Sequence, residues 1–149
     1  MSEPIFRAFN NKTKEWIDNF LITPNGRVVI QVQQSGWQNF KDVVTDATLC
    51  RSTGLRDRKR TKEFPDGEMI FEFDIVKGHY GARNSIECGE VFYKKEYLQY
   101  YVKDAFNNEF CLHGFDQSPY RKIDIEIIGS SLENQELLEE KKWFVKIDM

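Results

Sequence analysis

Hydrophobic and polar residues alternate with a period of two along much of the chain, and a period of 3.6 residues is nearly absent. In residues 27–33 the apolar side chains occupy alternate positions and so share one face of an expected strand. Asn25-Gly26 comes just before it, a pair that favours a two-residue type I′ turn because both turn positions need a positive φ. The pattern therefore predicts a β-hairpin with Trp16–Ile22 as the partner strand.

Similar alternation predicts further short strands along the chain. Phe71, Phe73 and Ile75 are expected to point inward, with Glu72 and Asp74 on the polar face. Ile123, Ile125 and Ile127 repeat this pattern against Asp124 and Glu126. The remaining predictions are two aromatic-rich strands, Glu90–Tyr93 and Tyr97–Lys103, and three breaks in the pattern at Gly54–Gly67, Gly78–Gly89 and Ala105–Tyr120.

One short helix is expected near the C-terminal end. Ser130–Glu133 fits a capping box, in which a hydroxyl and a glutamate satisfy exposed backbone N–H groups, and Asn134 is an alternative cap. The helix is expected to end near Lys141-Lys142. The segment Trp143–Ile147 alternates again, so it is either a final strand or an arm that docks on another subunit.

Short strands separated by turn signals indicate an antiparallel meander or a small barrel, because no crossover segment before residue 130 is long enough for a parallel sheet. The expected fold class is therefore mainly β, with one short C-terminal helix. The whole of residues 1–149 is expected to form a single unit. Within it, the pattern allows an N-terminal β subdomain at 1–50, a barrel-like part at 51–130, and the helix and tail at 131–149.

Composition supports an ordered protein with an aromatic-rich core. Hydrophobic residues make up 40% of the 149 residues, charged residues 30% and aromatic residues 14%. No apolar run reaches the roughly 18 residues of a membrane span, and no secretory signal is expected. The three cysteines have long spacings that imply no disulfide framework, so a reducing cytosol is the expected location.

The formal net charge of −3 hides one strongly basic segment. Six cationic side chains lie close together with a single acid, Asp57, among them: Arg51, Arg56, Arg58, Lys59, Arg60 and Lys62. Such a loop could present several cations to the phosphates of a nucleic acid. A solvated surface loop is the ordinary alternative, because charge runs usually face water.

Other combinations of reactive side chains are weaker. Cys111 and His113 would share a face if their segment were extended, but two ligands do not make a zinc site, and His79 or Cys88 would have to complete it. Asp124 and Glu126 share a strand face and could in principle do acid–base work, but nothing in the sequence indicates that either is desolvated, so they are expected to be the solvated face of a strand. No phosphate-binding glycine loop, nucleophile elbow or zinc-protease motif occurs. The sequence therefore predicts no catalytic residue, no metal ligand and no cofactor.

Five aromatic residues follow one another closely in the second half of the chain: Tyr93, Tyr97, Tyr100, Tyr101 and Phe106. They could form a stacking platform for single-stranded nucleic acid. Alternation would bury about half of them, so a shared core or a subunit interface is the other interpretation.

Three blocks along the chain resemble the YopX family of phage and prophage proteins. Phe6–Asn10 is similar to the family's opening "FRAWD". Ser52–Asp57, together with Asp74–Val76, resembles the central "STGLKDKNGKEIFEGDIV". Ile125–Gly129, together with Glu133–Leu138, resembles the closing "IEVIGNIYENPELL".

The resemblance implies a mostly β fold with the character of an SH3-like, partly open barrel, a phage or prophage origin, and no catalytic residues to carry over. Two departures affect the expected structure. Phe73 stands where the family has glycine, so the bend there is expected to relax into a regular strand. Asn134-Gln135 replaces Asn-Pro, which removes the preset φ of proline at the first helical position.

Two hypotheses about function follow. The first is a non-enzymatic accessory protein in the cytoplasm of a bacterial host, a homo-oligomer that also contacts a host or phage protein, with no membrane partner. The second is a nucleic-acid-binding module that uses the basic segment Arg51–Lys62. The sequence does not assign a molecular target to either one.

Overall fold

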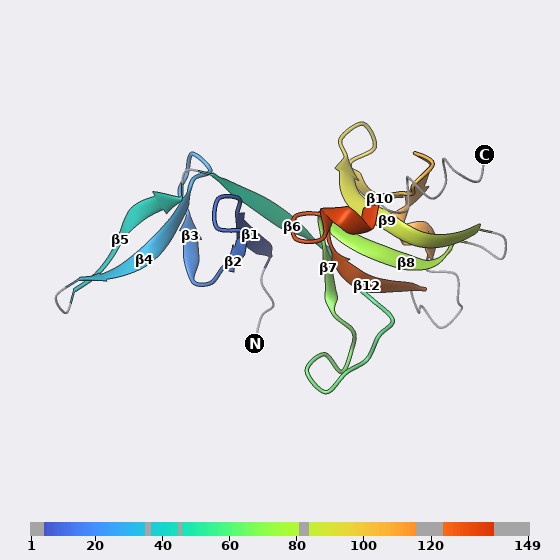
Figure 1. Cartoon of the computed structure of the whole chain (residues 1–149), viewed down its shortest axis with the longest axis horizontal. Coiled ribbons are helices and arrows are strands. Elements are labelled where there is room, and N and C mark those ends of the chain that lie inside the picture. The colour runs from blue at the N-terminus through green and yellow to red at the C-terminus, as the bar shows by residue number, and fades with distance from the viewer. Residues whose placement is uncertain (1–4, 35–36, 45, 81–83, 116–123, 139–149) are drawn as a thin grey trace. The chain divides into compact units, whose positions relative to one another are not determined.

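The computed structural model describes residues 5–34, 37–44, 46–80, 84–115 and 124–138. The chain divides into two compact units, residues 1–51 and residues 52–149, and each is described by itself (Figure 1). The predicted tail Trp143–Ile147, the helix end at Lys141-Lys142 and the position of Ile123 lie outside the described residues.

The strands of the first unit belong to two antiparallel sheets. Its strands are β1 (Phe6–Asn10), β2 (Glu15–Ile17), β3 (Phe20–Ile22), β4 (Val28–Gln34), β5 (Trp37–Val44) and the first half of β6 (Ala47–Arg56). Strand β1 pairs with β2 and β6, while β3, β4 and β5 form a three-stranded sheet. Phe9 is buried, and its ring meets the edge of Trp16 at 5.0 Å between centroids, so this pair anchors the small core.

The predicted N-terminal hairpin is present, but two details of the prediction are wrong. Strand β3 pairs with β4 in the register Ile22↔Val28, and the expected long partner Trp16–Ile22 is split because Asn19 has a φ of 53°. At the turn, Gly26 N–H donates to the Thr23 carbonyl and only Gly26 has a positive φ, of 83°. The loop is therefore a three-residue connection with glycine in the left-handed position rather than a type I′ turn.

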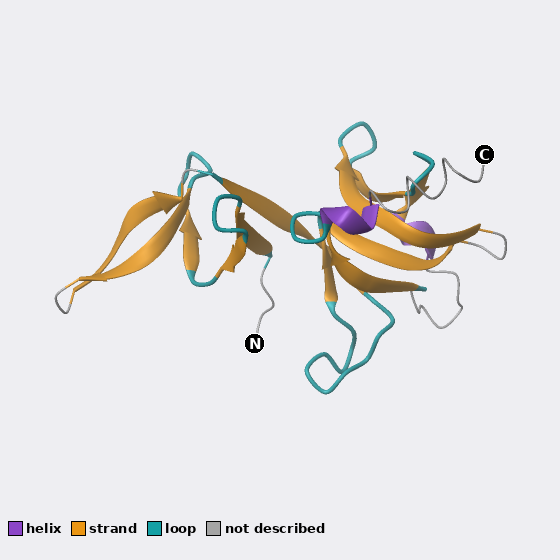
Figure 2. Ribbon diagram, viewed as in Figure 1, coloured by secondary structure: helices purple, strands orange, loops and turns teal. Residues whose placement is uncertain are grey.

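The second unit is a curled antiparallel sheet in the order β11-β10-β9-β8-β12, with β7 paired to the second half of β6 (Figure 2). Its elements are β7 (Met69–Phe71), β8 (Asp74–Tyr80), β9 (Asn84–Lys94), β10 (Gln99–Lys103), β11 (Glu109–Cys111), the 3₁₀ turn η1 (Leu112–Phe115) and β12 (Ile125–Ser130). The buried core consists of aliphatic side chains and one ring: Ile70, Val76, Ile86, Val91, Val102, Leu112, Phe115 and Ile125. The predicted mainly β, antiparallel, partly open architecture is confirmed, and it is compatible with the SH3-like label.

The expected regular strand through Phe73 is wrong, because the chain bends sharply there. Phe73 has a φ of 70°, a left-handed conformation that costs about 1–2 kcal/mol for a residue with a Cβ. Its N–H donates to Val91 O at 2.8 Å, and its carbonyl accepts from Ser131 N at 2.7 Å. Asp74 is 2% exposed rather than solvated, and its carboxylate accepts from Phe71 N at 2.8 Å. These three hydrogen bonds hold the bend in place without the glycine.

Two of the predicted breaks contain regular structure. Within Gly78–Gly89, strand β8 continues to Tyr80 and β9 begins at Asn84. Within Ala105–Tyr120, β11 is followed by the η1 turn, whose Phe115 contacts Tyr80 at 5.1 Å between ring centroids. A Cβ on Gly114 would lie 2.2 Å from the Tyr80 ring, so glycine is needed for this close packing.

The short helix begins after Asn134, at residues 135–138. The helix therefore does not start at the capping box predicted over Ser130–Glu133, where the Ser130 hydroxyl accepts from Leu132 N. Asn134 Oδ1 accepts from Ser130 N at 3.2 Å and so ties the end of β12 to the start of the helix. No helix among the described residues is long and apolar enough to cross a membrane.

Candidate functional site

The predicted break at Gly54–Gly67 begins within strand β6, which continues to Arg56. Gly54 has a φ of 79° at an irregularity in the β6–β7 pairing, and Thr53 Oγ1 donates to Ile70 O at 2.7 Å. Asp57 is 5% exposed, and its carboxylate accepts from Glu68 N at 2.8 Å and from Ile127 N at 3.1 Å. Asp57 therefore joins both ends of the basic loop to strand β12.

The loop between β6 and β7, residues 57–68, carries most of the predicted basic residues. Arg51 belongs to the first unit and the other five belong to the second. Arg56 Nη1 donates to Gly67 O at 2.8 Å, which closes the loop. Arg60 and Lys62 lie on its exposed part.

Arg58 and Lys59 contact acidic residues that are distant in the sequence. Arg58 forms an ion pair with Asp124, and its second nitrogen lies 3.6 Å from a Glu126 oxygen. Lys59 Nζ lies 3.8 Å from the other oxygen of Glu126. The carboxylates predicted as a wet strand face are therefore a bridge that holds the basic loop against β12.

Two residues that the sequence analysis did not connect with the loop join this cluster from β8. Lys77 Nζ lies 3.8 Å from Glu126, and His79 Nδ1 lies 3.2 Å from Asp124. With Arg58 they line an open hollow of about 380 Å³. Alternation along β8 places Lys77 and His79 on one face, but only the pairing of β8 with β12 brings them to the acids.

The aromatic series divides between two faces of the β9–β10 hairpin, as alternation predicts. Tyr100 packs against the buried core, and its ring lies 5.2 Å from that of Tyr93. Phe92 and Tyr101 are partners on the opposite face, with ring centroids 6.2 Å apart. At the hairpin tip, Tyr97 is 61% exposed and lies 6.0 Å from Tyr101, while Leu98 is 74% exposed. Phe92, Tyr97, Leu98 and Tyr101 are called the outer aromatic patch below.

A charged pair crosses the same face of the sheet. Lys94 forms an ion pair with Glu109, and its Nζ lies 5.1 Å from the Tyr97 ring centroid and 5.2 Å from that of Tyr101. The hydrogen bond to Glu109 raises the pKa of Lys94 above its ordinary value of 10.5, against an opposing effect of desolvation. Loss of water around its hydroxyl raises the pKa of Tyr101 above 10.0, with a smaller effect from Cys111. Both groups therefore keep their protons at neutral pH.

The Cys111 and His113 pair does not share a strand face. Cys111 ends β11, and His113 lies in the η1 turn, where the two-residue alternation no longer applies. Across the described part of the chain, no three His, Cys, Asp or Glu side chains lie close enough to hold a metal ion.

Comparison with known proteins identifies the family and the fold. A family model described as "YopX protein" matches residues 5–139. The solved structure of protein yopX from Bacillus subtilis is 18% identical, with a TM-score of 0.54 over 89% of this chain and 95% of that one. Protein EF1440 from Enterococcus faecalis is 21% identical, with a TM-score of 0.55 over 91% and 98%. No functionally curated protein matches the chain. At these identities the structural likeness shows the fold alone.

Proposed function

The chain belongs to the YopX family, and we propose that it is a non-enzymatic interaction protein that assembles with copies of itself through the outer aromatic patch. The observation that carries the proposal is the exposure of Tyr97 and Leu98 at the hairpin tip, 61% and 74%. Large apolar side chains in this position are in contact with water unless another surface covers them. Aromatic residues of this kind are enriched in protein interfaces.

The charges around the patch favour a second copy as the partner. The same sheet face carries Lys94 and Lys103 as well as Glu90 and Glu109. Lys103 pairs with Glu90 and Glu109 across neighbouring strands, and Lys94 forms an ion pair with Glu109. In a two-fold arrangement the same surface faces itself, so each copy must present both signs of charge. A mixed face with aromatic residues between its charges meets that requirement.

Light scattering coupled to size-exclusion chromatography tests the assembly. The protein is expected to elute as an oligomer at micromolar concentration, and Leu98→Asp with Tyr97→Ser is expected to weaken association at least about tenfold, because a charge replaces exposed apolar area. Leu21→Asp is the matched control, since Leu21 is 52% exposed in the first unit. A wild-type monomer of 17.7 kDa at micromolar concentration contradicts the proposal.

Nucleic-acid binding is the second candidate, supported by the exposed Arg60 and Lys62 and by the hollow that Arg58 lines with Lys77 and His79. Asp124 and Glu126 offset part of this positive charge. Changing Arg58, Lys59 and Arg60 to Glu is expected to abolish binding to DNA or RNA at low salt while leaving self-association unchanged. Unchanged nucleic-acid binding in this variant contradicts the second candidate.

The origin of the protein and the compartment in which it works are also part of the proposal. The family resemblance supports a phage or prophage product that works in the cytoplasm of a bacterial host. A host or phage protein that the assembled form contacts would be a further partner. Covalent capture with a photoreactive residue at position 98 in induced host cells tests both statements, because it records what lies against the patch.

A further inference from the structure

Two pairs in the sequence place an amide or a carboxylate side chain directly before a glycine, Asn25-Gly26 and Asp66-Gly67. At such a pair the backbone nitrogen of the glycine can attack the side-chain carbonyl carbon of the residue before it, because glycine has no Cβ to obstruct the approach. The product is a five-membered succinimide ring, which water opens. The surroundings of the two pairs in the structure differ.

The Asn25-Gly26 turn is exposed and has room around it. Both residues lie at the surface in the loop between β3 and β4. A Cβ placed on Gly26 would meet no atom within 4 Å, so a ring can form there without displacing a neighbour. The Gly26 N–H donates to Thr23 O at 2.9 Å, and at the surface water can replace this hydrogen bond when the turn opens locally.

The side chain of Thr23 adds a chemical feature to this turn. Its hydroxyl donates to Asn25 Oδ1, the oxygen on which negative charge develops when a nitrogen attacks the carbonyl carbon. The same hydroxyl oxygen accepts from Arg27 N at 3.0 Å, which fixes the side chain in this position. Thr23 therefore polarises the carbonyl group that is attacked.

The surroundings of Asp66-Gly67 oppose the same reaction. Gly67 is buried, and a Cβ on it would lie 2.1 Å from the main-chain oxygen of Asp57. The Gly67 carbonyl also accepts from Arg56 Nη1 at 2.8 Å. A ring that takes in the Gly67 nitrogen would have to displace this close packing.

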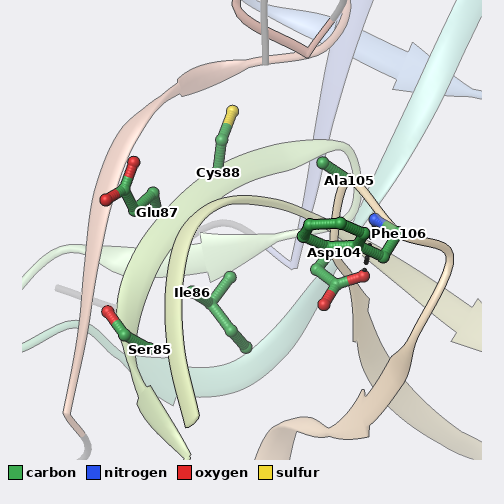
Figure 3. Close-up of a pocket in the computed structure, with 7 residues that line it drawn as sticks. All are labelled: Ser85, Ile86, Glu87, Cys88, Asp104, Ala105 and Phe106. Atoms are coloured by element: carbon green, nitrogen blue, oxygen red, sulfur yellow. Dashed lines mark hydrogen bonds between the residues drawn. The ribbon is translucent and has the colours of Figure 1, made fainter. Parts of the chain in front are cut away.

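The turn after β10 provides an internal comparison, because Asn107 is exposed there as well. The nitrogen that would attack its side chain belongs to Asn108, which carries a Cβ and donates to Asp104 Oδ1 at 2.8 Å. Figure 3 shows the same carboxylate joined to Phe106, whose N–H donates to it at 2.9 Å. Asp104 therefore holds both this turn and the nitrogen within it.

We propose that Asn25 is a site of spontaneous deamidation, with water as the only co-reactant. The Gly26 nitrogen gives its proton to a solvent base and forms a bond to Asn25 Cγ. The bond from Cγ to the side-chain nitrogen breaks, and that nitrogen leaves as ammonia with a proton from water. Water then opens the ring, at the Cγ carbonyl to give aspartate or at the main-chain carbonyl to give isoaspartate, and nothing is oxidised or reduced.

Either product alters the hairpin of the first unit. Aspartate adds a negative charge to the turn, and isoaspartate adds one carbon to the backbone between Thr23 and Arg27. The length of this loop sets the register Ile22↔Val28, and β3 is a strand of 3 residues at the end of its sheet. The reaction therefore weakens the pairing of β3 with β4, and it does so independently of assembly through the outer aromatic patch.

Incubation of the full-length protein at neutral pH, followed by peptide mapping with mass spectrometry, tests the proposal. Asn25 is expected to convert at least about tenfold faster than Asn107, and Gly26→Ala is expected to slow the conversion about tenfold, because the added Cβ obstructs the attacking nitrogen. A rate at Asn25 no higher than that at Asn107 overturns the proposal. A rate at Asn25 that rises more than about tenfold when urea unfolds the chain also overturns it, because the fold would then protect the site.

Heavy-oxygen water extends the test to Asp66, since opening of a succinimide leaves one heavy oxygen atom in the carboxylate. Asp66 is expected to take up the label in the urea-unfolded chain and not in the folded protein. Equal uptake in the two states overturns the argument that the surroundings of Gly67 oppose the reaction.

The role of Thr23 and the effect on the hairpin have separate tests. Thr23→Val is expected to slow the conversion of Asn25 about threefold, a modest effect because the hydroxyl acts in water rather than in a closed site, and Thr23→Ser is expected to restore the rate. Unchanged or faster conversion in Thr23→Val overturns the role of the hydroxyl. Amides of β3 and β4 are expected to exchange with solvent faster in the converted fraction, and equal exchange overturns the weakening of the hairpin.

Discussion

The two sides of the second unit use their side chains in opposite ways. On the loop side, which comprises residues 57–68, the Phe73 bend and residues 124–126, the polar groups bind other parts of the same chain. On the hairpin side, the outer aromatic patch leaves Tyr97 and Leu98 exposed. The segment with the highest charge density thus includes side chains that bind within the protein, while the hairpin tip exposes the large apolar side chains of Tyr97 and Leu98. Charge density in a sequence therefore does not by itself locate a binding surface.

Among the residues of the loop side, Asp57 is expected to contribute most to the stability of the fold. Asp57→Ala leaves the N–H groups of Glu68 and Ile127 without their carboxylate acceptor, so the free energy of unfolding is expected to fall by about 3 kcal/mol. Urea denaturation followed by circular dichroism measures the change. Asp66→Ala is the control, because Asp66 is exposed in the same loop. Equal stability of the two variants would show that Asp57 does not anchor the loop.

A smaller effect on stability is expected at the Phe73 bend. Phe73→Gly is expected to be more stable than Phe73→Ala by about 1 kcal/mol, because both lose the ring and only glycine adopts a φ of 70° without strain. Thermal unfolding of the two variants measures the difference. At Met69, a strand residue whose φ is not positive, the order is expected to reverse, with alanine the more stable. The same order at both positions contradicts a strained bend.

The hairpin side is expected to respond to alkaline pH. In the folded protein the pKa of Lys94 is raised above 10.5 and that of Tyr101 above 10.0. The stability that each protonated group contributes is therefore present below these values and is lost as pH rises through the folded pKa. Stability should therefore fall above pH 10.0, and Tyr101→Phe with Lys94→Gln should flatten that fall. Urea midpoints across this range measure the slope. Lys95→Gln should leave the slope unchanged, because it keeps the Lys94–Glu109 hydrogen bond.

Much of the fold was predictable because alternation is a local property. The hairpin at Asn25-Gly26, the aromatic strands of β9 and β10, and the inward-facing Phe71 and Ile75 all follow from a period of two. The bend at Phe73 was not predictable in the same way. A phenylalanine between alternating residues favours a strand, and the hydrogen bonds to Val91 and Ser131 that hold the left-handed conformation come from distant segments.

The same distinction between local patterns and contacts of distant segments applies to the candidate sites. Alternation predicted only that about half of the aromatic series is buried, and in the structure Tyr100 packs against the core while Tyr101 lies on the opposite face, because neighbouring strand residues face opposite ways. The pairing of Arg58 with Asp124 joins residues 66 positions apart, and no local pattern indicates it. Cys111 and His113 do not share a face, because a 3₁₀ turn replaces the extended backbone that a shared face requires.

The sequence by itself determined a mainly β protein of the YopX family, because alternation and the three family blocks can be read along the chain. The contacts between distant segments show that Asp57 is a buried anchor, that Asp124 and Glu126 hold the basic loop, and that the hairpin tip lies outside the core. The physical reason is that burial and charge pairing depend on which strands lie next to one another. That arrangement is set by contacts between segments far apart in the sequence.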